Sequence, residues 1–336
     1  MLFVACWSGC AGGFLVKPDK AQPLPKELTD EMKEKFEIKD APLTGAALVS
    51  TSVVSKKKKR KKGPAEPYVI PNRRPEVDPL QIGEKHVFNI TYFGVSAGDF
   101  TMEVLPYKLI ADRRVYHIRG TAISSNLFSV FYRLNDVVET FLDYEGLFSH
   151  RFHILLDESK QARDSVELFD SEKKQTFYWS RWNHKERGYS ETKEFAPIQP
   201  FSQDSLSALL YLRTIPLPTG AVITFPVVSE GKAWEAVVTV LRRETVDSPN
   251  GPIQAVVLKP ETRYQGILKK QGDSFLWLTD DSNRYVLRLE AKVKIGTVIA
   301  KLSSIQAGNT AAAMASSPVP EQSAMPSATP LPSLRP

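Results

Sequence analysis

Hydrophobic side chains recur at every second position through much of the chain between residues 79 and 305. The pattern is clearest from 285 to 295, where an apolar set alternates with a mostly charged one: Tyr285, Leu287, Leu289, Ala291, Val293 and Ile295 against Arg288, Glu290, Lys292 and Lys294. Residues 87–92 and 148–156 show the same period. A strand with one apolar and one polar face is typical of an antiparallel sheet that is solvated on one side.

Shorter runs rich in β-branched and aromatic residues indicate further strands. They lie at 100–105, 114–123, 134–142, 163–169, 175–180, 221–228, 233–241, 253–259, 274–279 and 297–302. Clusters of Gly, Pro, Asn and Asp separate them, as in Ser248-Pro249-Asn250-Gly251, and such clusters favour tight turns.

A convincing helical period occurs from Asp204 to Arg213, where Leu206, Leu209 and Leu210 share a side with Arg213. Asp204 or Ser202 is placed to cap the start of this helix, and Pro216 ends it. The sequence therefore predicts a mostly β fold over residues 79–305. Its expected form is a single large antiparallel sheet, as a sandwich or partly open barrel, with one helix.

The segments on either side of residues 79–305 differ in composition. Residues 17–78 are rich in proline and contain a basic run, so they predict a flexible basic tether. Within it, the spacing of Leu28, Met32 and Phe36 is compatible with a short amphipathic helix. Residues 306–336 consist largely of Ala, Ser and Pro and predict a disordered tail.

Residues 1–16 are apolar or small, and both cysteines of the chain lie here. The stretch is too short for a transmembrane helix. It resembles the end of a bacterial lipoprotein signal, with Ser8 and Gly9 before Cys10, and Cys6 is a competing lipidation site. The basic region expected of a secretory signal is missing. One interpretation is that the true start codon lies upstream, and the alternative to a lipoprotein is a cytoplasmic protein with a buried apolar N-terminus.

The formal net charge of +6 comes from one tract. Seven consecutive basic residues stand together: Lys56, Lys57, Lys58, Lys59, Arg60, Lys61 and Lys62. Residues 79–305 hold 28 basic and 27 acidic side chains, so a basic nucleic-acid-binding surface on the fold is excluded. We expect the tract to bind an anionic membrane surface beside a lipid anchor, with a purely solubilising role as the alternative.

Four motifs resemble the bacterial domain-of-unknown-function 3108 family. They are Gly83-Glu84-x3-Phe88-x3-Tyr92-x-Gly94-x2-Ala97-Gly98, Asp204-x-Leu206-Ser207-x3-Tyr211-x-Arg213, Trp277-Leu278-Thr279-Asp280-Asp281-x2-Arg284 and Gly296-Thr297-Val298-x-Ala300-x-Leu302. The chain departs from the family after Arg284, where Tyr285-Val286-Leu287 stands instead of an early proline. The resemblance implies an exported envelope protein with an antiparallel β domain of unknown activity.

Two clusters of aromatic residues are the candidate ligand pocket. Phe128, Phe131 and Tyr132 form one, within a lid-like loop, and Phe177, Trp179 and Trp182 belong to the other. A strand that is apolar on both faces occurs in a doubly covered sheet or beside a cavity for a hydrophobic ligand. Core packing and a lipid pocket are both compatible with this pattern.

Several polar residues have a functional and a structural interpretation. In the functional interpretation, Asp280 and Asp281 are a pair of carboxylates that hydrolyse a glycan or bind a cation. In the structural interpretation, they form a hairpin turn. Asp204, Arg213 and Arg284 are weaker candidates. Asp204 also suits a helix cap, and Arg213 suits the helix C-terminus or an ion pair with an acid on the sheet.

The sequence predicts no cofactor and no metal site. No glycine-rich nucleotide-binding loop is present. His150 and His153 are three residues apart in a strand pattern, so they point to opposite faces and cannot share a metal ion.

These observations predict a periplasmic protein anchored to the outer membrane of a Gram-negative bacterium. Its β domain is expected to bind a lipid or cell-wall fragment without catalysis. An envelope glycan hydrolase that uses acidic residues, and a scaffold that docks other envelope proteins, are the alternatives. Nucleic acid is not an expected partner.

Overall fold

One antiparallel sheet dominates the computed structural model, which describes residues 24–26, 28–41, 68–264, 267–269, 273–293 and 295–311. The strands are β1 (Lys39–Asp40), β2 (Lys85–Tyr92), β3 (Val95–Ile110), β4 (Arg113–Ser124), β5 (Asn135–Asp143), β6 (Ser149–Asp157), β7 (Gln161–Asp170), β8 (Gln175–His184), β9 (Gly188–Pro197), β10 (Val222–Ser229), β11 (Lys232–Ser248), β12 (Gly251–Tyr264), β13 (Ile267–Lys269), β14 (Ser274–Thr279), β15 (Val286–Lys292) and β16 (Thr297–Gln306). The helices are α1 (Asp30–Lys35), α2 (Asn126–Ser129) and α3 (Ser205–Thr214). None of these helices is long and apolar enough to cross a membrane.

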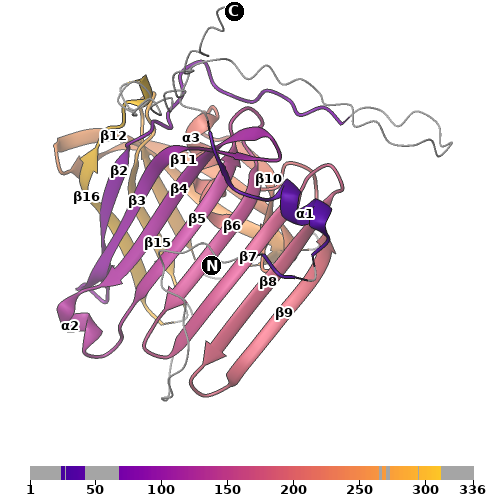
Figure 1. Ribbon diagram of the computed structural model, residues 1–336. Coiled ribbons are helices and arrows are strands. Elements are labelled where there is room, and N and C mark those ends of the chain that lie inside the picture. The colour runs from indigo at the N-terminus through magenta and orange to yellow at the C-terminus, as the bar shows by residue number, and fades with distance from the viewer. Residues whose placement is uncertain are drawn as a thin grey trace, which may run out of the picture.

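The sheet is curved and open. Its order is β10-β11-β12-β14-β15-β16-β2-β3-β4-β5-β6-β7-β8-β9, with β1 added to β3 and β13 to β12. The strands at its two edges, β9 and β10, do not pair with each other within the described ranges. Figure 1 shows the sheet curving round, with β10 to β16 behind β3 to β8. The predicted mostly β fold with one large antiparallel sheet is confirmed, in its partly open form.

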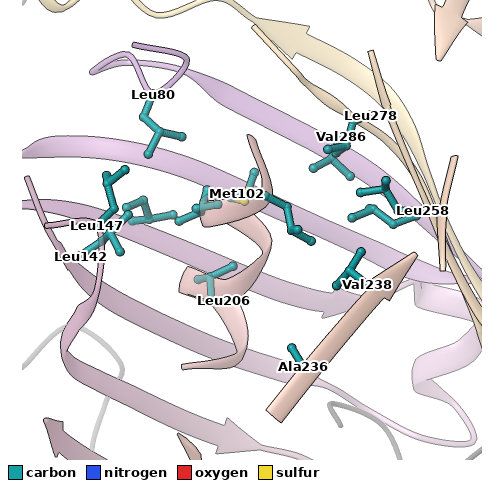
Figure 2. Packing of buried hydrophobic residues seen from close by; sticks show 14 of the residues in the cluster. Leu80, Met102, Leu142, Leu147, Leu206, Ala236, Val238, Leu258, Leu278 and Val286 are labelled. Carbon is teal, nitrogen blue, oxygen red and sulfur yellow. The ribbon is translucent and has the colours of Figure 1, made fainter. Parts of the chain in front are cut away.

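Helix α3 lies inside the curve of the sheet and packs against both of its halves (Figure 2). The Asp204 side chain accepts hydrogen bonds from the backbone N–H of Leu206 and Ser207, and the Ser207 side chain completes a capping box. Leu206 and Leu210 are buried in the main core cluster. Figure 2 shows Leu206 between side chains of both halves of the sheet, among them Leu142 and Val238. The concave side is therefore largely a packed core.

Helix α1 covers part of the outer face of the sheet. Leu28 and Phe36, which flank it, are 4% and 0% exposed and pack with Phe177 and Trp179 of β8. The short helix compatible with the Leu28 spacing is present. The prediction of a flexible tether over 17–78 is wrong for residues 28–41, because their apolar side chains find partners on a face of the sheet that the sequence leaves unassigned.

Strand β9 was missed by the sequence analysis, and its burial gives the reason. Nine of its ten residues are exposed, so neither face shows an apolar alternation. Strands β3 and β11 also extend beyond their predicted ends. Helix α2 adds to the single helix expected in residues 79–305, whereas α1 is the short helix that the spacing of Leu28, Met32 and Phe36 allowed.

Candidate functional site

A cavity of about 90 Å³ lies in the interior, beside the N-terminal end of α3. Its lining combines an apolar floor with polar groups: Phe100, Gly120, Ala122, Asp136, Val138, Phe152, Ile154, Leu156, Arg163, Ser165, Glu167, Tyr178, Ser205, Ser229 and Glu230. An apolar cavity with a few converging polar groups is the usual form of a ligand site, although drug-sized ligands need roughly 300–1,000 Å³. This cavity is the strongest candidate site in the described part of the chain.

The turn between β10 and β11 covers the cavity from the side of the open sheet edge. Its Glu230 Oε1 lies 2.9 Å from Arg163 Nη1 on β7. The backbone N–H of Gly231 donates to Glu167 Oε1 at 3.0 Å. Gly231 has φ +72°, a backbone conformation that favours glycine, so a larger residue would be strained in this turn. The β10–β11 turn, at one edge of the sheet, therefore contacts β7, which lies near the other edge.

Glu167 is the most buried acidic group in the cavity wall, with 3% of its surface exposed. Burial raises its pKa to about 7, although hydrogen bonds from Gly231 N–H and Thr176 Oγ1 favour the charged form. The carboxyl group is therefore partly protonated at neutral pH, and can both donate and accept hydrogen bonds.

Asp136 marks the other end of the cavity, close to Glu158. Burial raises the pKa of Asp136 to about 7, with a further contribution from the Glu158 carboxylate. The strand register places Arg163 at this end, and Glu167 follows four residues along β7, about 13 Å further on. Asp136 and Glu167 therefore lie at opposite ends of the cavity.

Replacing Asp136 by asparagine is expected to change how stability depends on pH. Asn Oδ1 keeps the acceptor for Asp157 N–H, which lies 3.0 Å away in the native protein. Because the folded-state pKa of Asp136 is raised, the native protein loses stability as the pH rises from about 4 to about 7. Asp136→Asn removes this loss and should be more stable above pH 7 by about 1–3 kcal/mol. Urea unfolding across this range measures the difference, and parallel curves would contradict the assignment.

Asp204 is fully engaged in structural contacts. Besides capping α3, its Oδ2 accepts hydrogen bonds from Thr140 Oγ1 and Ser149 Oγ, both at 2.6 Å. Burial raises its pKa. These contacts connect α3 to β5 and β6, so Asp204 positions the helix and does not face the cavity as a reactive group.

Arg213 forms a buried ion pair with Glu84, directly before β2. Its Nη1 lies 2.6 Å from Glu84 Oε1, and the two side chains are 0% and 1% exposed. The guanidinium also donates to the backbone carbonyls of Pro79 and Asn283. Burial and the Arg213 charge lower the pKa of the adjacent His86 to about 3, so this imidazole stays neutral. The predicted pairing of Arg213 with an acid is present, and its role is structural.

The acidic pair Asp280 and Asp281 forms a turn between β14 and β15. Asp280 Oδ2 lies 2.7 Å from Arg243 Nε. Asp281 Oδ1 accepts from Thr279 Oγ1 and from the backbone N–H of Arg284. Arg284 itself has φ +48° at this turn. The two carboxylates contact different partners, so Asp280 and Asp281 form a hairpin turn and not a paired hydrolase site.

The six aromatic residues proposed to form one pocket lie in three places. Phe177 and Trp179 pack beneath α1 on the outer face. Trp182 contacts His184 and donates to Gln161 Oε1. Phe128, Phe131 and Tyr132 lie at or just after α2, at the end of the sheet. None of the six lines the cavity, so the expected common pocket is wrong. Alternation assigned the strands and the side chains that share a face, but it did not show which face of each strand is interior.

The remaining candidates from the sequence are placed as follows. His150 and His153 bind different carboxylates, Asp143 at 2.8 Å and Asp164 at 2.9 Å. The described residues contain no group of three or more potential metal ligands. Cys6, Cys10 and the basic tract from 56 to 62 lie outside the described residues.

The site residues that the sequence analysis missed are Asp136, Arg163 and Glu167. Ser165 and Glu167 do alternate with the apolar Val166 and Leu168 along β7, although Asp164 stands between Arg163 and Ser165. In an antiparallel strand, that alternation indicates a solvated face. Here the polar face turns into the curve of the sheet, and the apolar face is covered by the α1 region, so only the tertiary structure identifies these groups as interior.

The comparison with known families agrees with the motifs. A family model described as "Protein of unknown function (DUF3108)" matches residues 87–303. The chain belongs to the DUF3108 family. The resemblance inferred from the four motifs is thereby confirmed, and the DUF3108 region contains the whole cavity lining, α3 and the Asp280 turn. The chain matches none of the curated proteins compared with it.

Three crystal structures resemble the DUF3108 chain at low identity. A β-barrel-like DUF1849 protein from Brucella abortus has a TM-score of 0.44 and 10% identity, over 68% of this chain and 99% of that one. A protein with a YmcC-like fold from Bacteroides fragilis, described as exported, has a TM-score of 0.30 and 11% identity, over 69% and 99%. A protein from Parabacteroides distasonis, described as a lipoprotein, has 0.30 and 8%, over 71% and 100%. Similarity at this level carries no argument about function.

Proposed function

We propose that this protein is a non-enzymatic cell-envelope protein that binds a hydrophobic or envelope-derived ligand at the cavity beside α3. The observation that carries the proposal is the mixed lining, in which Phe100, Phe152 and Ile154 face the same space as Arg163 and Glu167. Such a lining suits an amphipathic molecule, with an apolar part on the floor and hydrogen-bonding groups at β7.

The open sheet edge supplies the route to the cavity. In the form described, about 90 Å³ is enough for water or a small group, but not for a lipid chain. The β10–β11 turn must therefore move for a larger ligand to bind. Two contacts hold the turn in place: the ion pair of Arg163 with Glu230, whose side chain is 56% exposed, and the hydrogen bond from Gly231 N–H to the buried Glu167. Both have to break when the turn moves.

The envelope location rests on the N-terminal sequence. A lipid on Cys10 or Cys6 would anchor the chain to the outer membrane, and the tract Lys56 to Lys62 would lie near the anionic membrane surface. Residues 79–305 are nearly neutral, so electrostatic attraction to the membrane surface would come from the tract and not from the β domain.

Native mass spectrometry of the full chain purified from bacterial membranes tests the proposal. We expect an added mass on the folded protein, or uptake of one from an envelope lipid extract or from soluble peptidoglycan fragments. Ala122→Leu, on β4, fills the cavity and should abolish this added mass. Thr121→Leu is the matched control, because Thr121 lies on the opposite face of the same strand. Protein that is consistently ligand-free with both extracts would contradict the proposal. The mass of the N-terminal peptide from the same sample reports lipidation of Cys10 or Cys6.

A further inference from the structure

Exposed apolar side chains gather at one end of the sheet. Of thirteen large hydrophobic residues that are exposed among those described, seven belong to three neighbouring connections at this end. The seven are Phe93, Val95, Ile123, Leu127, Val130, Phe131 and Ile295, with exposed fractions of 53–79%. We call this set the apolar tip. Figure 1 shows α2 projecting from that end of the sheet.

Hydrogen bonds hold the three connections of the apolar tip together. Ser125, which caps α2, donates from its backbone N–H to Ala97 O at 2.9 Å and from Oγ to Ser96 O at 3.1 Å. On the other side of the β2–β3 turn, Tyr92 donates from its hydroxyl to Ile295 O at 2.8 Å. The apolar tip is therefore one contiguous surface built from β2–β3, the α2 connection and β15–β16.

The β2–β3 turn holds a bulky apolar residue in a strained backbone conformation, with its ring 4.5 Å from that of Tyr92. Phe93 and Gly94 have φ of 51° and 75°, the signs required by a two-residue hairpin turn that favours Asn-Gly. A bulky residue at positive φ costs of order 1–3 kcal/mol. Phe93 nevertheless stands there with 63% of its surface exposed. Strain together with exposure suggests a selected contact outside the fold.

Basic and acidic side chains both lie near the apolar tip, and basic residues are concentrated in sequence at the β15–β16 turn. The loops themselves, residues 92–96, 123–132 and 293–296, contain no acidic residue. Lys292 and Lys294 stand at the β15–β16 turn, whereas Arg133, after the α2 connection, is paired with Asp157, and Asp99 lies opposite Ile123. Apolar loops that hold no acidic residue and carry two lysines at one turn match a lipid surface, in which acyl chains lie below anionic headgroups.

We propose that the apolar tip inserts into the interfacial layer of an anionic lipid bilayer. The projecting loop ends bury their apolar side chains among the acyl chains, while the tyrosines at their base and the flanking basic residues lie at headgroup level. A fluid bilayer accommodates projecting side chains from three separate loops without a preformed groove. This contact is independent of the cavity and its ligand.

The test uses the full chain with Cys6→Ser and Cys10→Ser, so that lipidation cannot contribute. Vesicles of phosphatidylethanolamine and phosphatidylglycerol are the probe, in a flotation assay. Val130→Asp with Phe131→Asp should lower vesicle binding about tenfold or more. The matched control, Val222→Asp with Phe195→Asp, changes the same residue types at exposed positions elsewhere and should retain binding within about twofold. Every variant keeps the tract from 56 to 62, so its attraction is constant.

A second measurement locates the contact directly. The chain has two cysteines, so the double Ser background is free of thiols and takes one label. An environment-sensitive dye on Phe131→Cys should shift to the blue and gain intensity with these vesicles, whereas a dye on Val222→Cys should not. Equal binding of the two Asp variants, or no dye response at 131, overturns the proposal. If position 131 crosslinks to a protein in cells and the dye there does not respond to vesicles, the proposal is also overturned. The apolar tip is then assigned to a protein partner.

Discussion

Replacing Arg213 by methionine is expected to lower the free energy of unfolding by about 3–5 kcal/mol. Methionine fills a similar length but leaves Glu84, at 1% exposure, without its guanidinium partner, with only His86 Nε2 at 3.3 Å beside it. The carbonyls of Pro79 and Asn283 also lose their donor. Because these groups belong to the segment before β2 and to the β14–β15 turn, the loss loosens the attachment of α3 to both.

Urea unfolding measures this change, and two further variants make it specific. Arg263→Met breaks a solvated pair with Glu235, in which the side chains are 39% and 38% exposed, and should cost about 1 kcal/mol or less. Adding Glu84→Gln to Arg213→Met should recover part of the loss, because the remaining buried charge is removed. A loss for Arg213→Met no greater than that for Arg263→Met would show that the buried pair is not important to the fold.

Phe36→Ala is expected to have the next largest effect, about 3–5 kcal/mol. Phe36 is 0% exposed and packs with Leu168, Phe177 and Trp179 on the outer face of β7 and β8. Its removal leaves a cavity at the contact that holds residues 28–41 to the sheet. We therefore expect faster amide hydrogen exchange in that segment and a lower unfolding midpoint.

The half-exposed Phe195 on β9 provides the control for Phe36. Its ring lies 4.8 Å from that of Phe177, but its side chain is 50% exposed, so Phe195→Ala should cost much less. If Phe36→Ala leaves both the unfolding midpoint and the exchange of residues 28–41 unchanged, the packing of α1 does not contribute to the stability of the domain.

The two candidate surfaces differ in what they need from the fold. The cavity requires curvature, since it combines side chains of β3 to β8 with Ser205 at the start of α3 and Glu230 beyond β10. The apolar tip requires only that three hairpin ends lie at one end of an antiparallel sheet. The apolar tip leaves a clearer signal in the sequence than the cavity does, because residues 120–132 contain no charged residue. The sequence analysis nevertheless assigned Phe131 to a pocket, because exposure cannot be read from apolar content.

The Asp280–Asp281 turn and α3 illustrate where local rules suffice. A short acidic sequence between two alternating strands predicts a hairpin turn, and the side chains of Asp281 and Thr279 close it as expected. Likewise Asp204, Ser207 and Pro216 define both ends of α3 without tertiary help. These features depend on contacts between residues that are close in sequence.

The sequence by itself determined most of the strands, the helix at 205–214, the family and the location of the charge, because each follows from periodicity or from neighbouring residues. It did not show β9, whose residues are exposed on both faces. The tertiary structure decided which face of β7 is interior, what covers Phe177 and Trp179, and which acid pairs with Arg213. Those outcomes depend on the direction in which the sheet curves and on contacts across more than a hundred residues, such as Glu84 with Arg213. A period of two fixes which side chains share a face, but it is the same whether that face meets water, a helix or the opposite wall of the sheet.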